Sequence, residues 1–179
     1  MTIATFNALN TSSYEYSYRG MFNKYPNVGY GTAFKRWCID KKATAYNSYG
    51  NGSAMRVGPI AILDNIDDVV NEAIKSASVT HNHPEGIKGA VIIAVCTHLL
   101  INGFDKDDIL NYACKYYSDE DILSPTLTLD EYEKIRKRIS TIYSVTCMHT
   151  VPLAIRCFYE SDNYEDCICL LYTSPSPRD

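Results

Sequence analysis

Two short segments of the sequence combine residue types and spacings that suit chemistry. The first places two glycines around an asparagine, in the order Ser48, Tyr49, Gly50, Asn51, Gly52, Ser53, Ala54, Met55 and Arg56. Glycine lets a backbone approach a ligand closely. The residues that follow look like the opening of a helix, whose free N–H groups and partial positive charge suit a phosphate. The alternative is a tight turn in which Ser53 caps a helix, with no ligand.

The second segment holds two histidines beside an acidic residue, in the order Thr80, His81, Asn82, His83, Pro84, Glu85 and Gly86. Such a pair could bind a metal ion or hydrogen-bond a ribose, although a structural turn between two helices is the commoner outcome. The motif is also similar to the metal site of metalloprotease-like deubiquitinases. Those proteins need a downstream Ser-x-x-Asp, which the twenty residues after Pro84 lack. We interpret His98 and His149 as structural.

The elements that must position these segments are predicted to be helices. Apolar residues from Ile66 to Ala77 recur at helical spacing, and Asp64 or Asn65 supplies the N-cap. Thr128 and Glu131 have the spacing of a capping box that opens a helix through Ile142. No stretch alternates like a strand, so the fold class is all-α. Further helical patterns cover residues 1–9, 14–24, 32–42, 84–102 (ended by Gly103), 105–116 (capped by Asp105), 151–160 (with Pro152 in its first turn) and 161–170.

Composition narrows the class of protein. The 179 residues fit one domain, and 46% hydrophobic with 21% charged residues is ordinary for a globular protein. A net charge of −4 argues against nucleic-acid and anionic-membrane partners. Seven cysteines form no disulfide framework. Because no signal peptide or membrane-length apolar run is evident, we expect a cytoplasmic protein, with Cys96 and Cys157 as buried thiols.

Taken together, the two segments resemble the ADP-ribosylglycohydrolase family. The matching stretches are residues 48–57 and 76–90, with the amphipathic helix between them, and residues 25–31 and 145–155 add support. The resemblance covers about Met1 to Leu170. It implies an all-α, orthogonal multi-helix bundle that hydrolyses the glycosidic bond between ADP-ribose and a protein side chain or related acceptor, with two magnesium ions in a cleft between helices.

The resemblance also assigns roles to residues of this sequence. Residues 48 to 52 would wrap the diphosphate and the adjoining ribose with backbone N–H groups. His81 would contact the ADP-ribose, and the stretch from Val145 to Cys147 would line the adenosine side. The partner would be an ADP-ribosylated protein or a small-molecule substrate, and the intact protein would be a monomer. The substrate-binding residues expected on this basis are Ser48, Tyr49, Gly50, Asn51, Gly52, Ser53, His81 and Val145, with Asn51, Glu85 and Lys88 also holding the loops in shape.

The departures from the family concern its metal ligands. In the family, magnesium is held by an acidic residue of the first helix, a Thr-Asp-Asp-Thr motif and a late Gly-Gly-Asp-x-Asp-Thr motif, and these are not found here. We therefore assign no catalytic or metal-binding residue and expect the 179 residues to be inactive as written, because nothing positions the cations or the water. Our hypothesis is a truncated gene model, with a partial domain over residues 1–170 and a non-native or disordered tail over 171–179.

Two alternatives stay open. The chain could be a non-catalytic protein that binds ADP-ribose or another nucleotide. It could instead be a helical structural or interaction protein in which the two segments are mere turns. That last alternative predicts that Ser48–Ser53 and His81 do not converge on one place.

Overall fold

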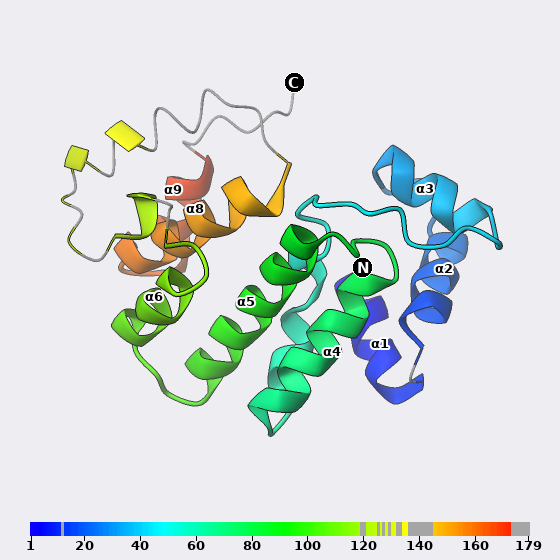
Figure 1. Cartoon of the computed structure of the whole chain (residues 1–179), viewed down its shortest axis with the longest axis horizontal. Coiled ribbons are helices and arrows are strands. Elements are labelled where there is room, and N and C mark those ends of the chain that lie inside the picture. The colour runs from blue at the N-terminus through cyan, green and yellow to red at the C-terminus, as the bar shows by residue number, and fades with distance from the viewer. Residues whose placement is uncertain are drawn as a thin grey trace.

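The computed structural model describes residues 1–11, 13–118, 121–124, 126, 128, 130–131, 134–135 and 145–172. Across these residues helices are joined by turns and no strand forms, which confirms the all-α class (Figure 1). The described elements are α1 (Thr2–Thr11), α2 (Tyr14–Lys24), α3 (Thr32–Ile39), the 3-10 helices η1 (Ala54–Arg56) and η2 (Gly58–Ile62), α4 (Ile66–Ser78), α5 (Pro84–Ile101), α6 (Lys106–Cys114), the 3-10 helix η3 (Asp121–Leu123), α8 (Cys147–Glu160) and α9 (Tyr164–Tyr172).

The pair α4 and α5 forms the centre of the molecule, with α1 to α3 on one side and α6, α8 and α9 on the other (Figure 1). Val69 and Ala73 of α4 and Ala90 and Ala94 of α5 are fully buried in one core. Small side chains on the facing surfaces let the two helices pack closely along their length. Because the second segment lies between α4 and α5, this packing sets where its histidines lie.

The helix α5 is buried on several sides. It packs against α4, η2, α6 and α8. Its 18 residues, with a mean hydropathy of 1.5, are long and apolar enough to cross a membrane by length and composition alone, but these neighbours account for the same composition. His98 lies in this helix, is buried, and its Nδ1 lies 3.0 Å from the Ala61 carbonyl oxygen. That contact confirms the structural interpretation of His98.

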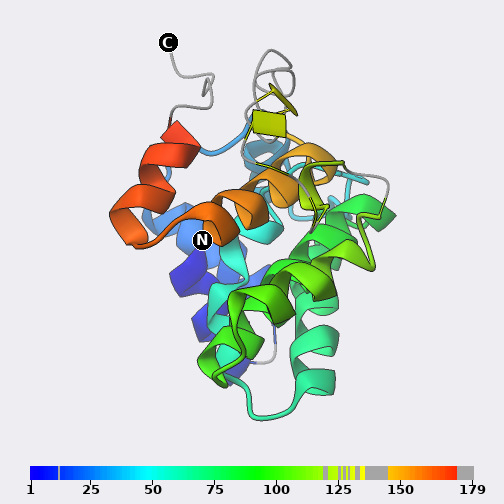
Figure 2. The same ribbon diagram turned by 90° about the vertical axis from the view of Figure 1, so that its left-hand side faces the viewer.

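A second core lies between α5, α6 and α8. Ile109 of α6 and Ile155 of α8 are buried in it, and Figure 2 shows α8 and α9, in orange and red, beside the green helices. Cys96 and Cys157 are buried thiols in the same core, as expected. Asp105 begins α6 with a capping box, in which its side chain accepts a hydrogen bond from the Asp108 N–H.

Several predicted boundaries are confirmed. The helix over residues 14–24 is α2, and Gly103 follows the end of α5 with a φ of +86°. Thr128 and Glu131 form the predicted capping box, with the Thr128 N–H donating to Glu131 Oε2 at 3.0 Å. Most of the helix predicted to follow that box lies outside the described residues, as do residues 173–179 of the predicted tail.

Other boundaries were wrong. The helix α3 ends at Ile39 instead of Lys42. The helix α8 begins at Cys147 instead of Val151, so Pro152 lies inside it and not in its first turn. The helix α9 begins at Tyr164 instead of Ser161 and runs to Tyr172, past the predicted end at Leu170. The early start of α8 depends on a residue far away in the sequence. The N–H of Cys147, the first residue of α8, donates a hydrogen bond to the Tyr49 carbonyl.

The N-cap of α4 gives a direct test of local structure. The Asn65 side chain accepts a hydrogen bond from the Asp67 N–H at 2.7 Å, which resolves the choice between Asp64 and Asn65. Replacing Asn65 with Ala is expected to lower the free energy of unfolding by about 1 kcal/mol, because one helix donor loses its acceptor. The matched change Asp64→Ala is expected to stay within about 0.5 kcal/mol of the unmodified chain. Urea unfolding measures both, and equal losses would contradict the assignment.

Candidate functional site

Residues 49–51 and 145–147 meet in the folded chain. Gly50 and Thr146 form an isolated antiparallel bridge. The Asn51 N–H donates to the Val145 carbonyl at 2.7 Å, and the Cys147 N–H donates to the Tyr49 carbonyl at 2.9 Å. These two hydrogen bonds fix the glycine-rich loop against the start of α8, although Gly50 and Cys147 are 97 positions apart in sequence.

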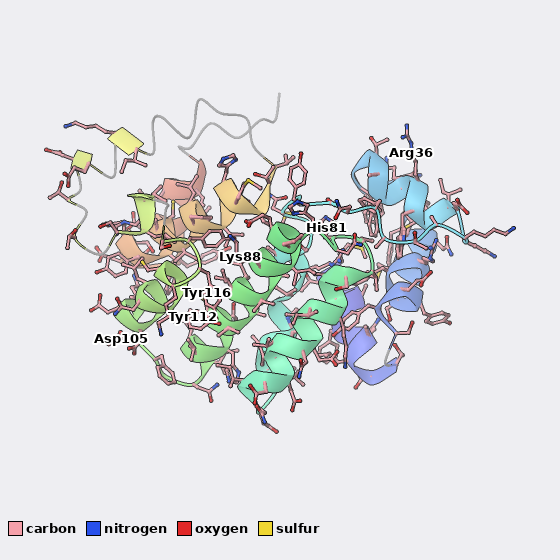
Figure 3. All side chains as sticks on the ribbon, viewed as in Figure 1. Arg36, His81, Lys88, Asp105, Tyr112 and Tyr116 are labelled. Carbon is pink, nitrogen blue, oxygen red and sulfur yellow. The ribbon has the colours of Figure 1, made fainter. Side chains whose placement is uncertain are left out.

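His81 lies beneath the same loop, at the junction of α4 and α5 (Figure 3). Its side chain is only 6% exposed. A Cβ atom placed on Gly52 would lie 3.1 Å from His81 Nε2, and one placed on Gly50 would lie 3.7 Å away. The two glycines therefore leave room for the ring, and the two segments converge. This convergence contradicts the alternative in which both segments are unrelated turns.

The start of α5 holds the loop from the other side. The Ser53 hydroxyl is fully buried and donates to the Gly86 carbonyl at 2.7 Å. Ser53 occupies the N-cap position of η1, as in the turn alternative, but its side chain makes no cap hydrogen bond to the residues that follow it. Those residues form the three-residue 3-10 helix η1, not the α-helix N-terminus expected beside a phosphate. Its short length leaves it without the aligned dipole of a full helix.

Cys147 supports the loop in a way that the sequence did not indicate. It is fully buried, and its thiol donates to the Gly50 carbonyl at 3.3 Å and lies 3.6 Å from Ser53 Oγ. Burial raises the pKa of the Cys147 thiol, so the sulfur keeps its proton and serves as a weak donor. The only signal in the sequence was its place in the stretch that resembles the family.

Two of the expected substrate-binding residues form an exposed rim. Tyr49 is 48% exposed and Val145 is 51% exposed, and the Gly50–Thr146 bridge brings their two segments side by side. The ring of Tyr49 meets His83 edge-on, with 5.3 Å between ring centroids. His83 Nδ1 in turn accepts the Glu85 N–H at 3.1 Å and caps α5. His83 is therefore a structural residue that steadies Tyr49.

The donors of the loop are partly used within the protein. The Gly50 N–H donates to Ser48 Oγ at 3.1 Å, and the Asn51 N–H is bound to Val145. A bound diphosphate would have to use other donors of the segment. Lys88, in Figure 3 further along α5, pairs with Glu85 at 2.8 Å and lies 4.4 Å from the Tyr117 ring centroid. These contacts suit the supporting role expected of Glu85 and Lys88.

The electrostatics beneath the loop are set by a buried arginine. Arg56 is 2% exposed and donates to Thr80 Oγ1 at 2.9 Å, and Thr80 Oγ1 lies 2.7 Å from His81 Nδ1. Burial, and secondarily the charge of Arg56, lower the pKa of His81 to about 3. The ring is therefore neutral at pH 7, so it offers a ligand a hydrogen bond and no positive charge. Neither Arg56 nor Thr80 was expected from the sequence to act at this site.

A metal centre does not form among the residues that the structure describes. Within that part of the chain no three side chains of His, Cys, Asp or Glu lie close enough together to hold an ion. The donors around the loop are backbone amides, hydroxyls, a thiol and a neutral imidazole, whereas magnesium requires several hard oxygen ligands. These residues do not fit a two-magnesium site.

The all-α fold and the convergence of three segments define a class of protein. The segments are residues 48–53, the segment that contains His81, and residues 145–147. The chain belongs to the ADP-ribosylglycohydrolase family, whose model matches residues 3–173. It is 30% identical to the ADP-ribosylarginine hydrolase Tri1 of Pseudomonas putida (strain GB-1) over 124 residues, which are 68% of this chain and 32% of that protein.

Two vertebrate proteins are also similar. The ADP-ribosylhydrolase ARH3 of Mus musculus is 33% identical over 49% of this chain and 28% of its own length. The ADP-ribosylhydrolase ARH3 of Gallus gallus is 36% identical over 46% of this chain and 26% of its own length. The chain thus spans about a third or less of the length of these curated relatives.

The contact between the loop and α5 can be tested at Gly86. A Cβ atom there would lie 2.6 Å from the Ser48 carbonyl oxygen and 3.0 Å from that of His81, both backbone atoms. Gly86→Ala is therefore expected to lower the free energy of unfolding by about 1–3 kcal/mol and to shift the backbone amide resonances of the loop. Gly58→Ala is the control, since its Cβ would meet nothing within 4 Å. A Gly86→Ala variant as stable as the unmodified chain would contradict this packing.

Proposed function

We propose that this protein acts in the removal of ADP-ribose from a modified protein side chain or a related acceptor, by hydrolysis of an N- or O-glycosidic bond. Family membership and the names of the relatives support the general reaction. The observation that carries the proposal is the convergence of the loop at residues 48–53, His81 and Val145 on one place. We further propose a monomeric, cytoplasmic protein without nucleic-acid or membrane partners.

In this proposal the loop and its rim recognise the ADP-ribosyl group. Tyr49 offers an exposed aromatic face, and Val145 an apolar surface, to the adenosine end. The backbone of residues 48–52 faces the diphosphate and the adjoining ribose. His81 supplies a neutral hydrogen-bonding group through the gap between the two glycines. Ser53 is fully buried and holds the loop to α5, so we assign it to positioning and not to direct contact.

The hydrolytic step is assigned to no described residue. Magnesium, which the family resemblance implies, would activate water and stabilise the developing charge, but its ligands would have to come from outside the described residues. We therefore propose that the 179-residue chain binds ADP-ribose without hydrolysing its conjugates. This also keeps the non-catalytic binding protein as the second candidate function.

Calorimetric titration of the chain with ADP-ribose tests the binding part. Saturable one-to-one binding is expected. Tyr49→Ala should weaken it about tenfold, because a stacked base loses its aromatic partner. Tyr16→Ala is the matched control, since Tyr16 is a 73% exposed tyrosine on α2. Absence of binding by the unmodified chain would overturn the proposed function, and equal effects of the two variants would remove Tyr49 from the site.

An assay of ADP-ribose release tests the catalytic part. With magnesium and an ADP-ribosylated peptide, the chain is expected to release no ADP-ribose, and release above the uncatalysed rate would show that the described residues suffice. Resequencing the source locus across both ends of the reading frame separates the two candidates. Acidic motifs of the family flanking the described region would favour the hydrolase, and their absence would favour the non-catalytic binder.

A further inference from the structure

Arg56 is a buried cation that lacks a carboxylate partner among the described residues. The residue is 2% exposed, and its guanidinium donates to the Ser76 carbonyl at 2.6 Å and to Thr80 Oγ1 at 2.9 Å. The guanidinium carbon lies 4.3 Å from the Tyr18 ring centroid. Ser76 is in the last turn of α4, where helix carbonyls carry partial negative charge. Burying a charge in this way is costly, which favours a role beyond filling space.

The contact between Thr80 and His81 indicates what Arg56 does. Its hydroxyl is fully buried and lies 2.7 Å from His81 Nδ1. A guanidinium can only donate, so Arg56 takes one lone pair of Thr80 Oγ1. The Tyr46 hydroxyl also hydrogen-bonds Thr80. When Tyr46 donates to the other lone pair of Oγ1, the hydroxyl hydrogen of Thr80 points at Nδ1. A neutral imidazole that accepts at Nδ1 carries its proton on Nε2, the nitrogen that faces Gly50 and Gly52.

We propose that Arg56 and Thr80 are positioning residues that hold His81 as a neutral imidazole with its proton on Nε2, directed at the gap between Gly50 and Gly52. The described residues offer Nε2 no hydrogen-bond acceptor of their own. An acceptor oxygen of a ligand, from a phosphate or a ribose hydroxyl, would complete the site. The ligand part rests on the proposed function, whereas the arrangement of Arg56, Thr80 and His81 does not.

The protonation state follows from the groups around the ring. Arg56 faces it from η1, and Tyr46 packs against it from the segment before the loop, with 5.8 Å between ring centroids. Burial first, and the Arg56 charge second, lower the pKa of His81 to about 3 from an ordinary 6.5. Between those values the unfolded chain binds the proton and the folded chain does not. Stability from this group is therefore full above about pH 6.5 and declines on acidification.

Nitrogen-15 NMR of the histidine rings in the full 179-residue chain tests the arrangement without any ligand. His81 is expected to show a protonated Nε2 and an unprotonated Nδ1, with no titration between pH 5 and 8. Thr80→Val should yield a mixture of the two tautomers, because the donor to Nδ1 is lost. Thr80→Ser keeps the hydroxyl and should preserve the unmodified pattern.

A His81 ring protonated at Nδ1 in the unmodified chain, or one that titrates between pH 5 and 8, would overturn the proposal even if every variant failed to fold. An unchanged tautomer in a folded Thr80→Val variant would overturn it as well. A folded Arg56→Met variant with unchanged His81 nitrogen shifts would remove Arg56 from the arrangement.

ADP-ribose titration then separates this proposal from the proposed function. Thr80→Val is expected to bind about tenfold more weakly than Thr80→Ser, the loss typical of one well-placed hydrogen bond. Equal binding by the two variants would overturn the positioning role of Thr80 toward a ligand. If the unmodified chain binds no ADP-ribose, the proposed function fails, while the nitrogen shifts still decide the state of His81.

Discussion

The backbone pairing between Gly50 and Thr146 is the contact on which the rest of the site depends. It joins the loop between α3 and η1 to the N-cap residue of α8, across about half of the chain. Closing so long a loop has an entropic cost, and the buried contacts of Ser53 and Cys147 beneath the loop help to offset it. Without this pairing Tyr49 and Val145 would not lie together at the edge of the proposed site.

Beneath the pairing, three buried polar side chains each have a partner, whereas Arg56 Nε and Glu85 Oε2 have no hydrogen-bond partner. Ser53 is bound to the α5 backbone, Cys147 to the loop, and His81 to Thr80. Since an unpaired buried polar group is unfavourable, these contacts specify one loop position and oppose the alternatives. A loop held in this way loses little conformational freedom on binding a ligand, which favours affinity. The buried contacts of Ser53, Cys147 and Thr80 therefore preorganise the loop before a ligand binds.

The sequence predicted α4 and α5 well, because their helical periodicity and caps are local signals. It did not predict that α8 begins at Cys147, since Thr146 has no side-chain cap and the start is set by the distant Tyr49 carbonyl. The expected helix after Ser53 failed for a similar reason, as the Ser53 hydroxyl bonds to Gly86. The convergence of the segments was expected only through the family resemblance, because local patterns carry no information about pairing over 97 positions.

Amide chemical-shift mapping during titration with ADP-ribose tests most directly whether the glycine-rich loop, His81 and the start of α8 form one ligand site. If they form one site, the resonances of the amides of residues 49–52 and 145–147 and of the His81 ring are expected to shift together, along a single saturation curve. Changes confined to one of these segments, or gathered elsewhere on the chain, would contradict it.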